Sequence, residues 1–283
     1  MRFGAHAYLW TPRWSDECLG LMDSARRLGL DALELSIGDD VPFTPALTRR
    51  RAEQLGLELL VGPGGLWPMD CDISLESPDD QRRGVAWHER AIDLAGEVGA
   101  SAYAGAIYGH PGRVECRMPT EAEYRRIAGH LHALAARAAA RGVRLVLEPM
   151  SHFRTHLVNR PDQLVRLVEL ADHPNLGILL DTFHMITEVR DYPGAVRAAA
   201  GRLWGLHACE SDRGVPGGGL VPWASLAAAL KEIGFDGYVG LETYCSAGGL
   251  APSRGLFHDP CPDGDAFVRE GLAFLKKALQ DAG

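Results

Sequence analysis

Four short apolar runs in the second half of the chain each end on a side chain that can bind a metal ion. These side chains are Glu148, Asp181, His207 and Glu242. Consecutive members are about 30 residues apart, the length of one strand plus one crossover helix. Because consecutive parallel strands end at the same rim of a sheet, this spacing predicts that the four side chains meet there.

Two glutamates, an aspartate and a histidine form a donor set of carboxylate oxygens and one imidazole nitrogen. Such a set suits Mn²⁺ or Mg²⁺ and accepts Co²⁺, whereas zinc is less favoured without thiolates. Any single strand-end acid can instead cap a helix or pair with an arginine. Four at matching positions favour one shared divalent ion, with carboxylates to spare for proton transfer.

Three polar residues lie just beyond these strand ends, where they would orient a polyol without touching the metal. They are His184, Glu210 and Arg213. Their ordinary alternatives are a loop histidine with a backbone partner and charges on the surface. Four aromatic residues that follow strand ends are candidates for an apolar wall against a sugar, or for the core: Trp10, Trp14, Trp67 and Tyr108.

The elements that must position these residues are eight predicted strands that alternate with helical patterns. One apolar stripe indicates a helix over Thr120–Arg141, with Thr120 and Glu123 as a capping box. Other helices are predicted to begin after Ser77 and near Pro161. The predicted strands are Phe3–Leu9, Ala32–Ile37, Leu57–Gly62, Ser101–Ile107, Val143–Glu148, Leu176–Asp181, Leu203–His207 and Tyr238–Glu242.

Eight such units in 283 residues favour an α/β fold with one (β/α)8 barrel over residues 1–283. An open doubly wound sheet would carry a glycine fingerprint after its first strand, and none is present. Barrel active sites lie at the carboxyl ends of the strands, where all four metal-binding candidates fall.

Composition excludes several classes of protein. A formal charge of −8 and a pI near 5.8 argue against nucleic acid as a partner and favour a small neutral substrate. No run approaches the roughly 20 apolar residues that cross a bilayer, so no membrane partner is expected. Six scattered cysteines without Cys-x-x-Cys spacing indicate reduced thiols in a cytoplasmic protein.

The strand-end motifs resemble the xylose-isomerase-like barrel superfamily, and within it the ketose 3-epimerases. The resemblance implies that Glu148, Asp181, His207 and Glu242 hold Mn²⁺. It also implies that Glu148 and Glu242 act as acid and base, and that His184 and Arg213 contact the sugar near O2 and O3. Glu210 would stand behind the metal ligands, and the chains would form homodimers or homotetramers. The motifs that carry the likeness are Leu147–Pro149, Leu180–Met185, Leu206–Arg213 and Gly240–Glu242.

Two departures from that family pattern leave the substrate open. After the first metal-binding glutamate these epimerases usually carry Asn-Arg and then another substrate-binding glutamate. Here the segment reads Ser151-His152-Phe153-Arg154, and His6 stands where an aromatic residue is common.

The expected chemistry is epimerisation of a free ketose at C3, in which Glu148 and Glu242 move the proton through a cis-enediolate. Rival reactions on the same site are aldose–ketose isomerisation, inosose dehydration and cleavage of a 3-keto C-glycoside. An endonuclease for abasic DNA would need further metal ligands and a basic groove. A sugar-binding barrel without catalysis is the remaining alternative.

Overall fold

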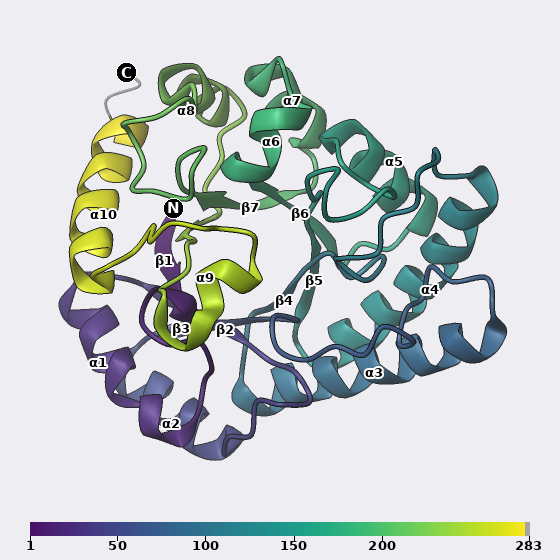
Figure 1. Cartoon of the computed structure of the whole chain (residues 1–283), viewed down its shortest axis with the longest axis horizontal. Helices are drawn as coiled ribbons and strands as arrows, with labels where there is room; N and C mark the ends of the chain where they lie inside the picture. The colour runs from purple at the N-terminus through teal and green to yellow at the C-terminus, as the bar shows by residue number, and fades with distance from the viewer. Residues whose placement is uncertain (281–283) are drawn as a thin grey trace.

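The computed structural model, which describes residues 1–280, is a closed barrel of eight parallel strands in chain order. Each strand pairs with the next, and β8 pairs with β1 to close the ring (Figure 1). The prediction of a single (β/α)8 barrel is confirmed. The strands are β1 (Arg2–His6), β2 (Ala32–Ser36), β3 (Glu58–Gly62), β4 (Ala102–Gly105), β5 (Arg144–Leu147), β6 (Leu176–Asp181), β7 (Leu203–Ala208) and β8 (Tyr238–Leu241).

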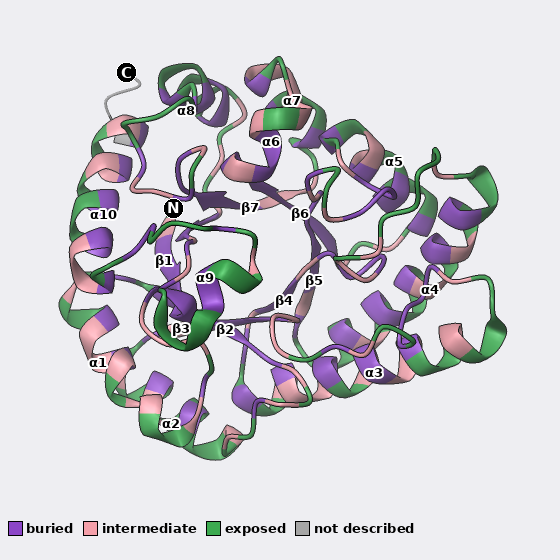
Figure 2. Cartoon of the chain, viewed as in Figure 1, coloured by how far each residue is buried: buried purple, intermediate pink, exposed green. Residues whose placement is uncertain are grey.

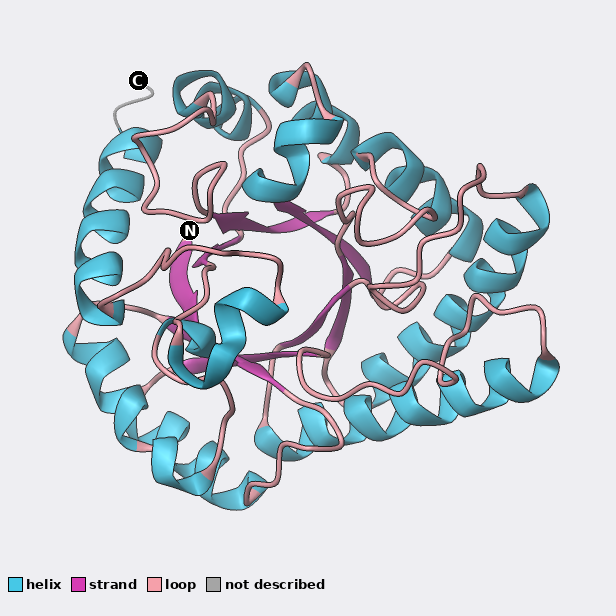
Figure 3. Ribbon diagram, viewed as in Figure 1, coloured by secondary structure: helices cyan, strands magenta, loops and turns pink. Residues whose placement is uncertain are grey.

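Helices surround the strands, as Figure 3 shows, and their exposed residues face away from the barrel (Figure 2). Within the described residues, no helix is both long enough and apolar enough to cross a membrane. The helices are α1 (Gly20–Arg27), α2 (Pro45–Leu55), α3 (Pro78–Val98), α4 (Glu121–Ala140), α5 (Pro161–Ala171), α6 (Thr182–Glu188), α7 (Tyr192–Ala199), α8 (Trp223–Glu232), α9 (Leu250–Ser253) and α10 (Gly264–Gln280).

Local sequence signals set the helix ends. At the start of α4, Thr120 Oγ1 accepts from the Glu123 N–H, and Glu123 Oε2 accepts from the Thr120 N–H, which completes the predicted capping box. The Ser77 side chain caps α3 by accepting from the Asp80 N–H, and α5 begins at Pro161 as expected. These helices therefore begin where the sequence predicts them.

Two predicted strands run too far. The first is predicted to reach Leu9, but β1 ends at His6, because the Tyr8 N–H donates to His6 Nδ1 and the chain enters a 3-10 turn. The fourth is predicted to reach Ile107, but β4 ends at Gly105, whose φ of +137° leaves the extended region.

A tyrosine fills the barrel interior near the start of β8. A methyl group added to Gly4 would lie 2.5 Å from Tyr238 Cε2, and one added to Gly240 would lie 2.3 Å from Tyr238 Oη. β1 and β8 itself therefore carry glycine where the ring packs. The interior cluster consists of Ala32, Leu60, Ala102, Ala104, Val146, Leu179 and Tyr238. Because this packing fills the barrel, a ligand can reach the site only from the carboxyl ends of the strands.

Candidate active site

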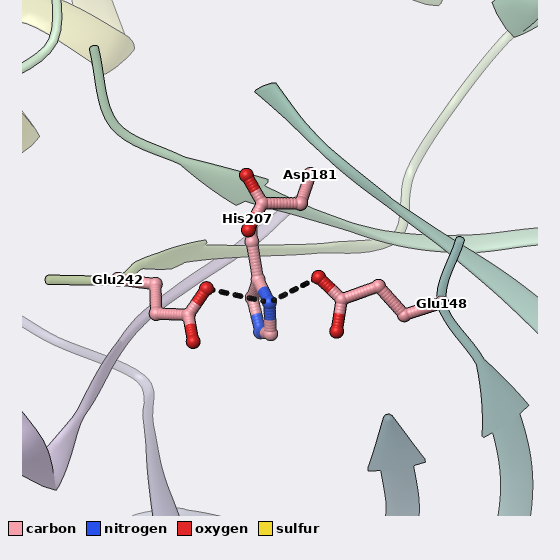
Figure 4. Close-up of side chains that lie close together, drawn as sticks. All are labelled: Glu148, Asp181, His207 and Glu242. Carbon is pink, nitrogen blue, oxygen red and sulfur yellow. Dashed lines mark ion pairs between the residues drawn. The ribbon is translucent and has the colours of Figure 1, made fainter. Parts of the chain in front are cut away.

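The four candidate metal ligands meet at the carboxyl ends of β5 to β8. One donor atom from each of Glu148, Asp181, His207 and Glu242 lies within 4.8 Å of the other three. Figure 4 shows Glu148 and Glu242 approaching His207 from opposite sides. His207 Nδ1 lies 3.5 Å from Glu148 Oε1 and 3.3 Å from Glu242 Oε2. The structure thus brings together all four residues that the spacing singled out.

Three polar atoms of this cluster are buried without a hydrogen-bond partner among residues 1–280. They are Glu148 Oε1, His207 Nδ1 and Asp181 Oδ2, the last of which forms an ion pair with Arg213 Nη1. Leaving buried polar atoms unsatisfied costs about 1–3 kcal/mol each. A cation bound between them would satisfy all three, and the oxygen-rich donor set suits Mn²⁺ or Mg²⁺. The residues present therefore fit a divalent metal ion.

A fourth carboxylate, from outside the cluster, orients the histidine. Glu34 on β2 is 3% exposed, and its Oε2 lies 2.9 Å from His207 Nε2. When Nε2–H donates to this carboxylate, the lone pair of Nδ1 faces the cluster, as a metal-binding imidazole requires. Sequence analysis missed Glu34, although a carboxylate inside the fully buried strand β2 was a usable signal.

The two glutamates lie in different electrostatic surroundings. Burial is the main cause that raises the pKa of Glu148. Burial also acts to raise the pKa of Glu242, but Arg213 and His207 outweigh it and hold that pKa well below its usual range. The Arg213 guanidinium lies 2.7 Å from Glu242 Oε2 and 2.9 Å from Asp181 Oδ2. Two carboxyl groups whose pKa values differ in this way suit a pair in which one acts as acid and the other as base.

Both residues predicted to contact substrate lie beside the cluster. Arg213 is 2% exposed, and its φ of +65° is rare for a residue with a side chain, a form of strain that concentrates at functional sites. His184 Nε2 lies 3.3 Å from Arg213 Nη2, and its Nδ1 is 2.8 Å from Ser151 Oγ. Burial, followed by the charge of Arg213, lowers the pKa of His184 well below its usual value.

Glu210 does not line the pocket. Its carboxylate accepts hydrogen bonds from the Gly217 N–H at 2.7 Å and from Trp223 Nε1 at 2.6 Å. The expectation that Glu210 orients a polyol directly is therefore wrong. It fixes the loop after β7, and that loop carries Arg213.

The pocket above the cluster receives residues from all eight strand ends and encloses about 780 Å³, counted to its open mouth. None of the four aromatic residues suggested from the sequence lines it. Tyr108 instead donates to the carbonyl oxygen of Glu148 at 2.9 Å, which holds that strand end. The aromatic lining consists of Tyr8, Phe153, Phe183 and Tyr244.

The family model described as the xylose isomerase-like TIM barrel matches residues 22–278. The chain belongs to this family. A probable ketose 3-epimerase from Synechocystis sp. is 26% identical, over 99% of this chain and 97% of the relative. A D-psicose 3-epimerase from Ruminiclostridium cellulolyticum is 28% identical, over 90% of this chain and 87% of the relative. The solved structure of an L-ribulose 3-epimerase matches with a TM-score of 0.92 at 30% identity, covering 99% of this chain and 95% of that chain.

These relatives confirm the likeness to ketose 3-epimerases that the strand-end motifs predicted. They also confirm the prediction of an isomerase that acts on carbohydrates. The matches cover nearly the whole chain.

Proposed function

We propose that the protein epimerises a ketose at C3, with one divalent ion held by Glu148, Asp181, His207 and Glu242. The observation that carries this proposal is the opposed placement of the two glutamates about one buried cluster. A bound ion would polarise the sugar oxygens and stabilise the negative charge that develops when the C3 proton leaves. Mn²⁺ is the ion we propose, and Mg²⁺ and Co²⁺ suit the same donors.

Epimerisation requires that a proton leave one face of a carbon and return to the other. In our proposal one glutamate takes the C3 proton, which leaves a cis-enediolate, and the other glutamate delivers a proton to the opposite face. The reverse reaction exchanges the two roles. His184 and Arg213 bind the sugar near O2 and O3, where the buried guanidinium adds positive charge beside the developing oxyanion.

Aldose–ketose isomerisation, inosose dehydration and 3-keto C-glycoside cleavage also begin with proton removal beside a carbonyl. The carbon that exchanges its proton therefore separates these reactions from C3 epimerisation. The full-length relatives named as 3-epimerases favour C3.

Proton NMR in D₂O tests this proposal, with Mn²⁺ removed by a chelator and then restored, and with fructose, tagatose, ribulose and an inosose as substrates. We expect deuterium at C3 and the C3 epimer of at least one ketose, both dependent on the ion. Label at C1 or C2 would identify an aldose–ketose isomerase instead. Ion-dependent sugar binding without any exchange would indicate a binding protein and overturn the proposal.

We further propose that the protein is a cytoplasmic homodimer or homotetramer. The free cysteines, four of them buried, support the cytoplasm, and the resemblance to the ketose 3-epimerases supports the assembly. Light scattering of the purified protein measures its mass directly, and a monomer would contradict the assembly.

A further inference from the structure

Besides Arg213, two further arginines line the pocket. Arg154 comes from the loop between β5 and α5, and Arg254 follows α9 in the segment after β8. In Figure 1, α9 lies near β1 and β3, and hydrogen bonds from Arg254 to residues that follow these strands confirm this proximity. Neither arginine was singled out by the sequence analysis as a binding residue.

Arg254 is held in place by residues from other segments. Its Nη2 donates to the Gly64 carbonyl at 2.6 Å and to Tyr8 Oη at 3.1 Å. Its guanidinium carbon lies 5.4 Å from the ring centre of Tyr8 and 5.9 Å from that of Tyr244. None of these partners is a carboxylate, and its buried Nε has no hydrogen-bond partner within residues 1–280. Arg254 is therefore a positioned cation with donors to spare.

Arg154 is half-buried, and its side chain forms no hydrogen bond or ion pair with any residue that the structure describes. Burial is the main cause that lowers the pKa of Arg154; Arg254 and Arg213 lower it further, while Tyr244 and Glu242 act to raise it. The contrast with Arg213 is clear, because Arg213 has both Asp181 and Glu242 as partners. A partly desolvated cation without a counter-charge costs free energy, which a bound anion would offset.

We propose that Arg154 and Arg254 bind an anionic group, a phosphate monoester or a carboxylate, on the end of the ketose remote from the two glutamates. A guanidinium matches either group through paired N–H donors. Tyr244 connects the two regions, because its hydroxyl donates to Glu242 Oε1 at 3.2 Å while its ring contacts Arg254. One ketose can therefore reach both the glutamates and the arginines.

This inference rests on the proposed epimerase function and narrows its substrate. The net charge of the whole chain, −8, favours an uncharged sugar. The charges that line the pocket lie much closer to a bound substrate, however, and therefore act on it more strongly than distant surface charges do. Apart from Glu34, the glutamates of the lining belong to the metal cluster, and Glu34 is paired with His207. Within residues 1–280, neither arginine forms an ion pair with an acidic side chain, although the charge of Glu242 acts on both.

The direct test compares kcat/KM for fructose, fructose 6-phosphate and the keto-uronate fructuronate, each with Mn²⁺ present. We expect one of the two anionic ketoses to be preferred over fructose by about 10- to 100-fold, from charge-assisted hydrogen bonds of about 1.5–3 kcal/mol. The preferred compound identifies the group as phosphate or carboxylate. Equal values for all three sugars would overturn the proposal.

Substitutions of the two arginines test whether these residues cause the preference for an anionic ketose over fructose. Arg154→Met and Arg254→Met should each reduce the ratio of kcat/KM for the anionic ketose to that for fructose by about tenfold or more. Arg27→Met is the matched control, because Arg27 lies on α1, donates to Ser24 and does not line the pocket. A ratio that survives both pocket substitutions would contradict the assignment.

A binding measurement separates failure of this inference from failure of the proposed function. Sorbitol 6-phosphate and sorbitol have no carbonyl, so calorimetry reports their binding without epimerisation. Arginine-dependent binding of sorbitol 6-phosphate, with no ketose epimerised, would keep the anion site and refute the epimerase. Epimerisation of fructose without any anion preference would keep the epimerase and refute the anion site.

Discussion

The orientation of His207 depends on Glu34, whose carboxylate occupies Nε2 and leaves Nδ1 toward the cluster. We predict that Glu34→Gln weakens Mn²⁺ binding by about 10- to 100-fold, because an amide holds the imidazole less strongly than a carboxylate does. Titration calorimetry with Mn²⁺ measures this change. Glu58→Gln is the control, since Glu58 is also a strand glutamate but pairs with Arg2 outside the pocket. An unchanged affinity in Glu34→Gln would remove the role assigned to this contact.

The sequence predicted the side chains that directly end the apolar runs, but it missed Glu34 within β2 and two arginines in loops. Glu148 and Glu242 follow apolar runs, so periodicity alone places them at the rim. Arg154 and Arg254 lie in irregular loops, and their position in the pocket depends on how those loops fold over other strands. Local patterns carry no information about such contacts, and the long-range hydrogen bond from Arg254 to Gly64 illustrates this.

Among the elements, β1 and β8 pack with a tyrosine ring between glycines. We predict that Gly4→Ala destabilises the fold by about 1–3 kcal/mol, because the added methyl would meet the Tyr238 ring and the Ala32 carbonyl. Urea unfolding followed by circular dichroism measures the change.

The matched control for this substitution is Gly129→Ala on α4. An added methyl there meets nothing within 4 Å, so alanine should stabilise the helix by about 0.5–1 kcal/mol. If Gly4→Ala and the wild type unfold at the same urea concentration, the proposed packing of the barrel interior is wrong.

Element boundaries were predictable where a local side chain sets them. The capping box that begins α4 needs only Thr120 and Glu123, three positions apart, and the structure forms it. The end of β1 was missed because the turn after it depends on an unusual acceptor, the ring nitrogen of His6. That histidine is itself part of the pocket lining, so the missed boundary coincides with a residue of the site.

For the whole molecule, ion binding and stability should be linked. The metal-binding atoms that lack a hydrogen-bond partner, Glu148 Oε1, Asp181 Oδ2 and His207 Nδ1, lie at the ends of β5, β6 and β7. An ion bound to all three would therefore link distant parts of the chain. We predict that Mn²⁺ at 1,000 times its Kd stabilises the fold by about 4 kcal/mol, and that a chelator reverses the effect. Thermal unfolding with and without the ion measures it.

Two variants make this measurement specific. Asp181→Asn should lose most of the Mn²⁺ response, because it removes the charge of one of the buried donors. Asp93→Asn should keep the full response, since Asp93 pairs with Arg137 and Arg141 on the outer helices. A wild-type melting temperature that is indifferent to Mn²⁺ would contradict the metal assignment.

The central claim is that two glutamates on opposite sides of the pocket act at C3. One removes the C3 proton, and the other delivers a proton to the opposite face. The most direct measurement is the C3 proton signal of a converted ketose in D₂O with Mn²⁺, for the wild type, Glu148→Gln and Glu242→Gln. We predict a wild-type product that carries deuterium at C3, and no detectable product from either variant. A product that keeps its original C3 proton, or turnover at the wild-type rate by Glu242→Gln, would contradict the claim.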